Sequence, residues 1–150
     1  MARLLVVHHS PTRSTKALLD AALEGARHPD IEGVEVEVIP ALEATADDVL
    51  AADGYLLGTP ANFGYMSGAL KHFFDTVYYP CLDATRGRPF GAYVHGNLGM
   101  EGAVKALRDI TGGLKWRAVV ATVALSGAPD GDARARCREL GATVAATLAL

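Results

Sequence analysis

Short apolar runs alternate with amphipathic helical patterns along the whole chain. The first run, residues 4–7, holds four aliphatic side chains and is typical of a strand that is buried on both faces. The run at 34–38 alternates valine with glutamate, which predicts a strand at the edge of a sheet, with one face in water. Further strands are predicted at 55–58, 90–95 and 117–125.

Apolar residues at helical spacing predict a helix after each of these strands. The expected helices cover 18–26, a short turn capped by Thr45, 70–77, 103–110 and 137–148. Tyr78-Tyr79-Pro80 is expected to end the third helix, and Thr111-Gly112-Gly113 the fourth. This alternation indicates an α/β fold: a doubly wound parallel sheet of five strands with helices on both faces. Central first and third strands beside an edge second strand favour the order 2-1-3-4-5 in a single domain, residues 1–150.

Length, charge and cysteine usage narrow the class of protein. A chain of 150 residues with a net charge of −3 lacks the concentrated basic stripe that nucleic-acid binding requires. Cys81 and Cys137 match no metal or disulfide spacing, and Arg86 follows Cys81 too closely for a Cys-x5-Arg phosphatase loop. There is no apolar run of signal-peptide or membrane-spanning length. We therefore expect a cytoplasmic protein with no nucleic-acid or membrane partner.

Ligands of doubly wound sheets bind beyond the carboxyl ends of the strands, where the strand order reverses. For the order 2-1-3-4-5, this point lies between the first and third strands. The segments that follow the first, third and fourth strands are the unusual ones in the sequence: 8–15, 58–68 and 95–102. We expect all three to converge on one crevice.

The first of these segments predicts an anion site. Four hydroxyl side chains fall within six residues at the start of a helix: Ser10, Thr12, Ser14 and Thr15. Helix starts present unpaired N–H groups and partial positive charge, which stabilise a bound phosphate. No acidic residue precedes Asp20, and Arg13 and Lys16 add positive charge. The alternative is simple helix capping, which needs one hydroxyl. The segment has neither the Gly-Lys-Ser/Thr of a Walker loop nor a Gly-x-Gly-x-x-Gly pattern.

The second segment, 58–68, holds three glycines, one proline and no acid, and it is expected to be a loop between strand and helix. Glycine and proline allow sharp turns and close approach of backbone amides to a ligand, although an ordinary connection would show the same residues. A phosphate-accepting receiver domain would need acids after the first strand and an aspartate after the third. Those places hold His8-His9 and Gly58-Thr59, which excludes this class.

Two motifs resemble those of a known family. Ser10-x-Thr12-x-x-Thr15 resembles the Ser/Thr-x-Thr-Gly-x-Thr phosphate loop of flavodoxins. The segment 60–68, followed by Leu70-Lys71-x-Phe73-Phe74-Asp75, is similar to the flavin-ring loop of the flavodoxin-like NAD(P)H:quinone oxidoreductases, the Trp-repressor-binding-protein-like branch. The likeness covers nearly the whole chain in order of elements. Arg13 replaces the usual glycine, Tyr65 replaces the usual asparagine, and the long insertion of that branch after the fourth strand is missing.

This resemblance implies a flavodoxin-like fold and an FMN-dependent oxidoreductase. NADH or NADPH would be the electron donor and a quinone or similar small molecule the acceptor, with no catalytic side chain and no metal. Because family members often form dimers or tetramers, a homo-oligomer is also implied. The implied cofactor-binding residues are Ser10, Pro11, Thr12, Arg13, Ser14, Thr15, Pro60, Ala61, Asn62, Phe63, Gly64, His95, Gly96, Asn97 and Gly99.

Two other functions stay open at this point. The first is a flavodoxin-type electron carrier, although such carriers are usually strongly acidic around the flavin, and here the flavin segments hold only Glu101. The second is a domain that has kept the fold and lost the cofactor, with Arg13 as the residue that would interfere. The visible absorption spectrum of the purified protein separates this last option from the other two.

Overall fold

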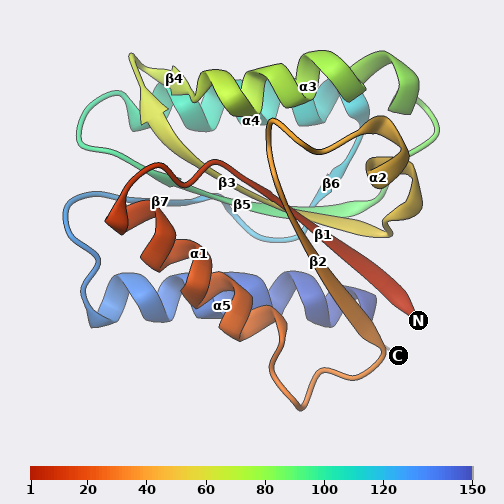
Figure 1. The fold of residues 1–150 in the computed structure, drawn as a ribbon, viewed down its shortest axis with the longest axis horizontal. Coiled ribbons are helices and arrows are strands. Elements are labelled where there is room, and N and C mark those ends of the chain that lie inside the picture. Colours follow the sequence, from red (N-terminus) through yellow and green to blue (C-terminus); the bar gives the residue numbers. More distant parts are fainter. Residues whose placement is uncertain (150) are drawn as a thin grey trace.

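The computed structural model describes residues 1–149 and has a parallel sheet between two layers of helices (Figure 1). The strands are β1 (Ala2–His8), β2 (Val34–Pro40), β3 (Gly54–Asn62), β4 (Tyr65–Met66), β5 (Pro89–His95), β6 (Arg117–Ala118) and β7 (Val123–Leu125). The helices are α1 (Arg13–Ala26), α2 (Ala46–Ala51), α3 (Gly68–Cys81), α4 (Met100–Leu114) and α5 (Gly131–Leu148). Helices α1 and α5 cover one face of the sheet, and α2, α3 and α4 cover the other.

The order of the parallel strands is β2-β1-β3-β5, with β6 and β7 both pairing with the outer side of β5. The predicted fold class and the order 2-1-3-4-5 are therefore confirmed. The count of strands differs, because the predicted fifth strand is split and β4 adds a short antiparallel partner to β3. Ala118 lies opposite Phe90, and Val123 lies opposite Tyr93. Between these two pairs, the outer segment has four residues, 119–122, whereas β5 has two, 91 and 92. The two extra residues of the outer segment therefore bulge out of the ladder.

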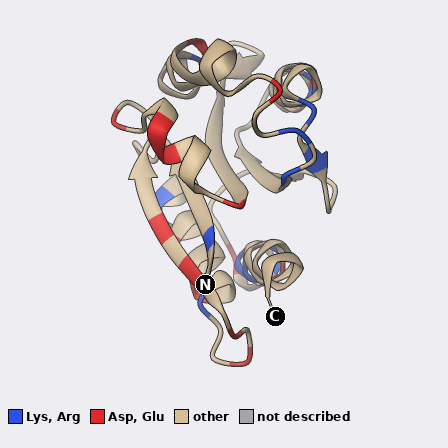
Figure 2. Cartoon of the chain, turned by 90° about the vertical axis from the view of Figure 1, so that its right-hand side faces the viewer, with Lys and Arg blue, Asp and Glu red and all other residues tan. Residues whose placement is uncertain are grey.

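Burial along the strands follows the sequence pattern. Residues Leu4–Val7 of β1 are fully buried, as expected for a central strand. Strand β2 alternates half-buried valines with exposed glutamates, which confirms it as an edge strand. Figure 2 shows these acidic positions along the outer strand. Within the described residues, no helix has the length and apolar character needed to cross a membrane.

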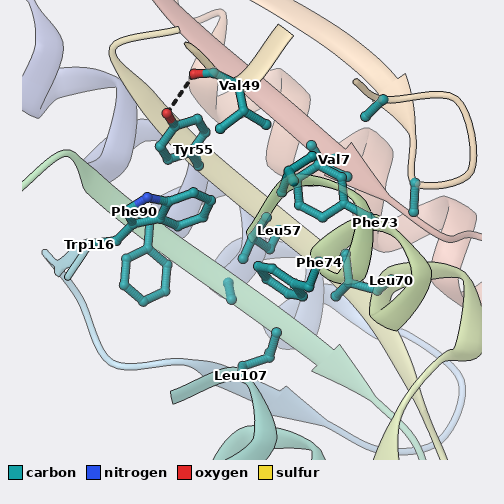
Figure 3. Packing of buried hydrophobic residues seen from close by; sticks show 14 of the residues in the cluster. Val7, Val49, Tyr55, Leu57, Leu70, Phe73, Phe74, Phe90, Leu107 and Trp116 are labelled. Carbon is teal, nitrogen blue, oxygen red and sulfur yellow. Dashed lines mark hydrogen bonds between the residues drawn. The ribbon is translucent and has the colours of Figure 1, made fainter. Parts of the chain in front are cut away.

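A cluster of aromatic rings fills the core below α3 and α4 (Figure 3). Tyr55 and Trp116 stack with their ring centroids 4.0 Å apart, and the Tyr55 hydroxyl donates to the carbonyl oxygen of Val49 at 2.7 Å. Arg88 donates to the same hydroxyl at 3.2 Å. This cluster lies near the amino end of β3, so it holds the sheet together away from the edge where the three unusual segments meet.

Two predicted helix ends are wrong. Helix α3 continues through Pro80 to Cys81, because a proline in the last turn removes only one hydrogen bond of the helix. Helix α4 continues through Gly112 and Gly113 and is capped by Lys115 in the left-handed conformation, with a φ of 60°. Both helices therefore end later than their turn residues predict.

Candidate functional site

The carboxyl ends of β1, β3 and β5 meet at the left edge of the sheet in Figure 1. This is the point where the strand order reverses, the place for which flavodoxin is the reference example of a ligand site. The amide of His9 donates to the Gly58 carbonyl at 3.0 Å, which ties the first segment to β3. On the other side, His95 Nε2 lies 2.8 Å from the carbonyl oxygen of Gly127. A fourth loop, which the sequence did not single out, thus borders the same edge.

The start of α1 is a capping box. The Thr12 hydroxyl accepts from the Thr15 amide at 3.1 Å, and the Thr15 hydroxyl accepts from the Thr12 amide at 3.0 Å. Two of the four predicted hydroxyls therefore serve the helix itself. The helix offers no acceptor to the amides of Arg13 and Ser14, so both are available to an anion.

The electrostatic character of this helix start is positive. Its first turn holds no acidic residue, and Arg13 and Lys16 are exposed beside it. Burial and the neighbouring His9 lower the pKa of His8, so that its imidazole is neutral near pH 7. His8 Nδ1 lies 2.9 Å from Ser10 Oγ, and this contact fixes the position of the Ser10 hydroxyl just before the start of α1. The positive potential thus comes from the helix dipole and the two exposed cations.

The expectation of a loop at 58–68 is wrong in its main part. Strand β3 continues to Asn62, the chain reverses at Phe63-Gly64, and β4 returns antiparallel, with Ala61 opposite Met66. Phe63 has a φ of 52° and Gly64 a φ of 72°, the left-handed pair of a type I′ turn. A bulky residue at positive φ is strained by about 1–2 kcal/mol. The Phe63 ring is also fully exposed, so packing within the chain does not explain its presence there.

Buried hydrogen bonds make the base of this hairpin rigid. The Thr59 hydroxyl accepts from the Ser67 amide at 3.0 Å and donates to the Pro60 carbonyl at 2.8 Å. Ser67 in turn caps α3 by accepting from the Leu70 amide at 3.2 Å. Pro60 is buried, whereas Asn62, Phe63 and Gly64 are exposed. The hairpin therefore presents its tip to solvent on a fixed base.

The third segment packs against the hairpin through glycines. A Cβ on Gly102 would lie 1.9 Å from the Gly64 carbonyl oxygen, and one on Gly99 would lie 2.7 Å from Gly64 Cα. A Cβ on Gly96 would lie 3.0 Å from Ala61 Cβ. The structure thus brings the second and third segments into direct backbone contact.

The remaining predicted residues lie around this contact. Asn97 is exposed in the turn before α4, and His95 and Gly96 are half-buried at the end of β5. Pro11 is exposed before α1. The role of all these residues in holding a cofactor stays a prediction. The third segment ends earlier than the predicted range 95–102, because α4 begins at Met100 and includes Gly102. Gly102 was not among the predicted cofactor-binding residues, since nothing in the sequence shows that the Gly64 carbonyl lies opposite it.

Residues 2–130 match the model of one family, described as NADPH-dependent FMN reductase. The chain belongs to this family. The motifs at 10–15 and 60–68 are consistent with that membership, and the predicted resemblance to flavodoxin-like proteins is confirmed.

Two curated relatives of this family member carry different descriptions. A flavodoxin of Aquifex aeolicus is 43% identical over 77 residues, which cover 51% of this chain and 40% of that protein. An NAD(P)H dehydrogenase (quinone) of Acidithiobacillus ferrooxidans is 33% identical over 95 residues, which cover 50% of this chain and 46% of that protein. The matches thus span less than half the length of either relative.

Solved structures share the fold of this family member at low sequence identity. A WrbA-like flavodoxin from Agrobacterium tumefaciens superposes with a TM-score of 0.77 at 20% identity, covering 99% of this chain and 98% of that one. Flavodoxin 1 from Bacillus cereus gives a TM-score of 0.81 at 19% identity, covering 95% and 97%. At these identities the likeness supports the flavodoxin-like fold alone.

Proposed function

We propose that this chain binds FMN and passes electrons from NADPH or NADH to a quinone or a similar small acceptor. The observation that carries the proposal is the juxtaposition of an acid-free helix start with a rigid, exposed hairpin at the switch point of the sheet. One side suits a phosphate and the other suits a flat aromatic ring. Membership in the NADPH-dependent FMN reductase family supports both the cofactor and the donor.

The residues present fit the chemistry of FMN. The amides of Arg13 and Ser14 and the hydroxyl of Ser10 would hold the phosphate. The strained and exposed Phe63 ring is explained if it covers an isoalloxazine, since backbone strain concentrates where a ligand requires it. Main-chain groups of 60–64 and 96–99 would border the ring. When bound, FMN would supply the redox chemistry, taking up two electrons from the nicotinamide and releasing them to the acceptor.

The experiment is a titration of purified protein with FMN, followed by an assay of NADPH and NADH oxidation with a quinone present. We expect a yellow complex that oxidises at least one of the two nicotinamides. A complex that binds FMN, leaves both nicotinamides unreacted and stabilises the one-electron reduced state would instead identify an electron carrier, which the match to the Aquifex aeolicus flavodoxin favours. Protein that binds no FMN would contradict both functions.

A substitution at the turn tests the role proposed for Phe63. Phe63→Asn gives the Asn-Gly pair that type I′ turns prefer, so the free energy of unfolding should rise by about 1 kcal/mol. The loss of the aromatic contact should weaken FMN and riboflavin alike by about fivefold to tenfold. Tyr79→Gln, which removes another exposed aromatic ring from the far end of α3, is the control and should leave both affinities unchanged. Unaltered flavin affinity in Phe63→Asn would contradict a ring contact.

A further inference from the structure

A buried tyrosine hydroxyl without a partner lies beneath the proposed phosphate site. Tyr93 of β5 is 1% exposed, and within residues 1–149 its hydroxyl oxygen has no hydrogen-bond partner. Buried polar groups of this kind are rare, because leaving one unpaired costs about 1–3 kcal/mol. The stability of the fold therefore does not explain why a tyrosine, and not a phenylalanine, occupies this position.

The direction of the Tyr93 side chain is set by a glycine. Tyr93 is in register with Gly58 of β3, which is in register with His8 of β1. A Cβ on Gly58 would lie 2.2 Å from the Tyr93 hydroxyl oxygen, so only glycine leaves room for the phenol to cross β3. The ring thus extends under the end of β1, toward the segment that begins α1.

In the phosphate segment, the Ser10 hydroxyl is close enough to influence the Tyr93 hydroxyl. Burial raises the pKa of Tyr93 far above its ordinary value, the Cys137 thiol adds to the rise, and the Ser10 hydroxyl opposes it. The Tyr93 hydroxyl thus keeps its proton and stays a donor at neutral pH. The two hydroxyls are neighbours but do not reach hydrogen-bond geometry, whereas Ser10 Oγ lies 2.9 Å from His8 Nδ1.

We propose that Tyr93 is a positioning residue of the anion site, which donates to Ser10 Oγ when an anion is bound and thereby commits the Ser10 proton to the phosphate. This inference rests on the proposed binding of FMN. A serine hydroxyl has one proton and two lone pairs. When Tyr93 and the Nδ1–H of a neutral His8 fill the two lone pairs, the proton can point only outward, to the anion. Without Tyr93, the Ser10 proton is free to turn elsewhere.

The test compares Tyr93→Phe with wild type for two ligands, FMN and riboflavin, which differ in the phosphate. FMN should bind about fivefold to tenfold more weakly, the size of one ordinary hydrogen bond, because the Ser10 proton is no longer held toward the phosphate. Riboflavin should change by less than about twofold. The apoprotein should unfold at the same or a higher denaturant concentration, since the substitution removes an unpaired hydroxyl. A double variant with Ser10→Ala should bind FMN no more weakly than Ser10→Ala alone, because Tyr93 acts through Ser10.

Tyr55→Phe is the matched control. Tyr55 is equally buried, but its hydroxyl is paired with Val49 and Arg88 at the opposite end of β3. The control should lower stability and leave the ratio of FMN to riboflavin affinity unchanged. Equal weakening of both ligands by Tyr93→Phe, unchanged FMN affinity, or additive losses in the double variant would overturn the inference. Wild-type protein that binds no FMN would overturn the proposed function as well, so the two failures are distinguishable.

Discussion

Replacing Gly102 with alanine should lower the affinity for FMN by about tenfold to a hundredfold, a loss of about 1.4–2.8 kcal/mol. The added Cβ would lie 1.9 Å from the carbonyl oxygen of Gly64. No rotamer change can relieve this distance, because the backbone of α4 fixes the position of the Cβ and the oxygen belongs to the backbone of the hairpin. Either α4 or the tip of the hairpin must move. Since the hairpin presents Phe63 and the neighbouring main chain to the proposed flavin ring, the ring site would lose its shape.

The same helix provides the control for this prediction. Gly112 also lies in α4, but a Cβ there meets nothing within 4 Å. Gly112→Ala should therefore stabilise the protein by about 0.5–1 kcal/mol through helix propensity and leave FMN affinity unchanged. Titration of both variants with FMN, with urea unfolding of the apoproteins beside it, checks the pair. Equal FMN affinities would show that the contact between Gly102 and Gly64 does not shape the site.

The parts of the fold that could be predicted are those in which one local pattern decides the outcome. Four aliphatic residues in a row at 4–7 require a strand that is buried on both faces. The alternation at 34–38 requires a strand at the edge of the sheet, with one face in water. Thr45 caps α2 as expected, because both residues of a capping box lie within four consecutive positions of the sequence. The sheet order followed from these local patterns together with the rules for parallel connections.

The parts that could not be predicted depend on contacts between distant segments. Nothing local marks Phe63-Gly64 as a type I′ turn, since phenylalanine is unfavourable at positive φ. Gly58 and Gly102 lie in segments that the sequence singles out, but nothing local shows that each makes room for an atom from another element, the Tyr93 phenol and the Gly64 carbonyl. The predicted convergence of the three segments is observed, whereas their contacts with each other became visible only in three dimensions.

The packing of α1 on α5 supports the strongest prediction on stability. The two helices approach each other through glycines: a Cβ on Gly141 would lie 2.0 Å from the carbonyl oxygen of Ala22, and one on Gly25 would lie 1.9 Å from that of Arg138. Gly141→Ala should lower the free energy of unfolding by about 2–3 kcal/mol, because overpacking against a backbone atom forces the helices apart. The gain in helix propensity, about 1 kcal/mol, is too small to offset this cost.

Gly131 is the control for this substitution. It lies in α5 as well, with nothing within 4 Å of a Cβ, so Gly131→Ala should change the free energy of unfolding by less than about 0.5 kcal/mol. Urea unfolding followed by the fluorescence of Trp116, which packs on the other face of the sheet, measures both variants. Gly25 lies in the last turn of α1, and Gly141 of α5 packs against Ala22 and Ala26, so both are far along α1 from its first turn, where the proposed phosphate site is. Folded Gly141→Ala protein should therefore keep the wild-type ratio of FMN to riboflavin affinity, and a changed ratio would show that α5 also sets the position of the anion site.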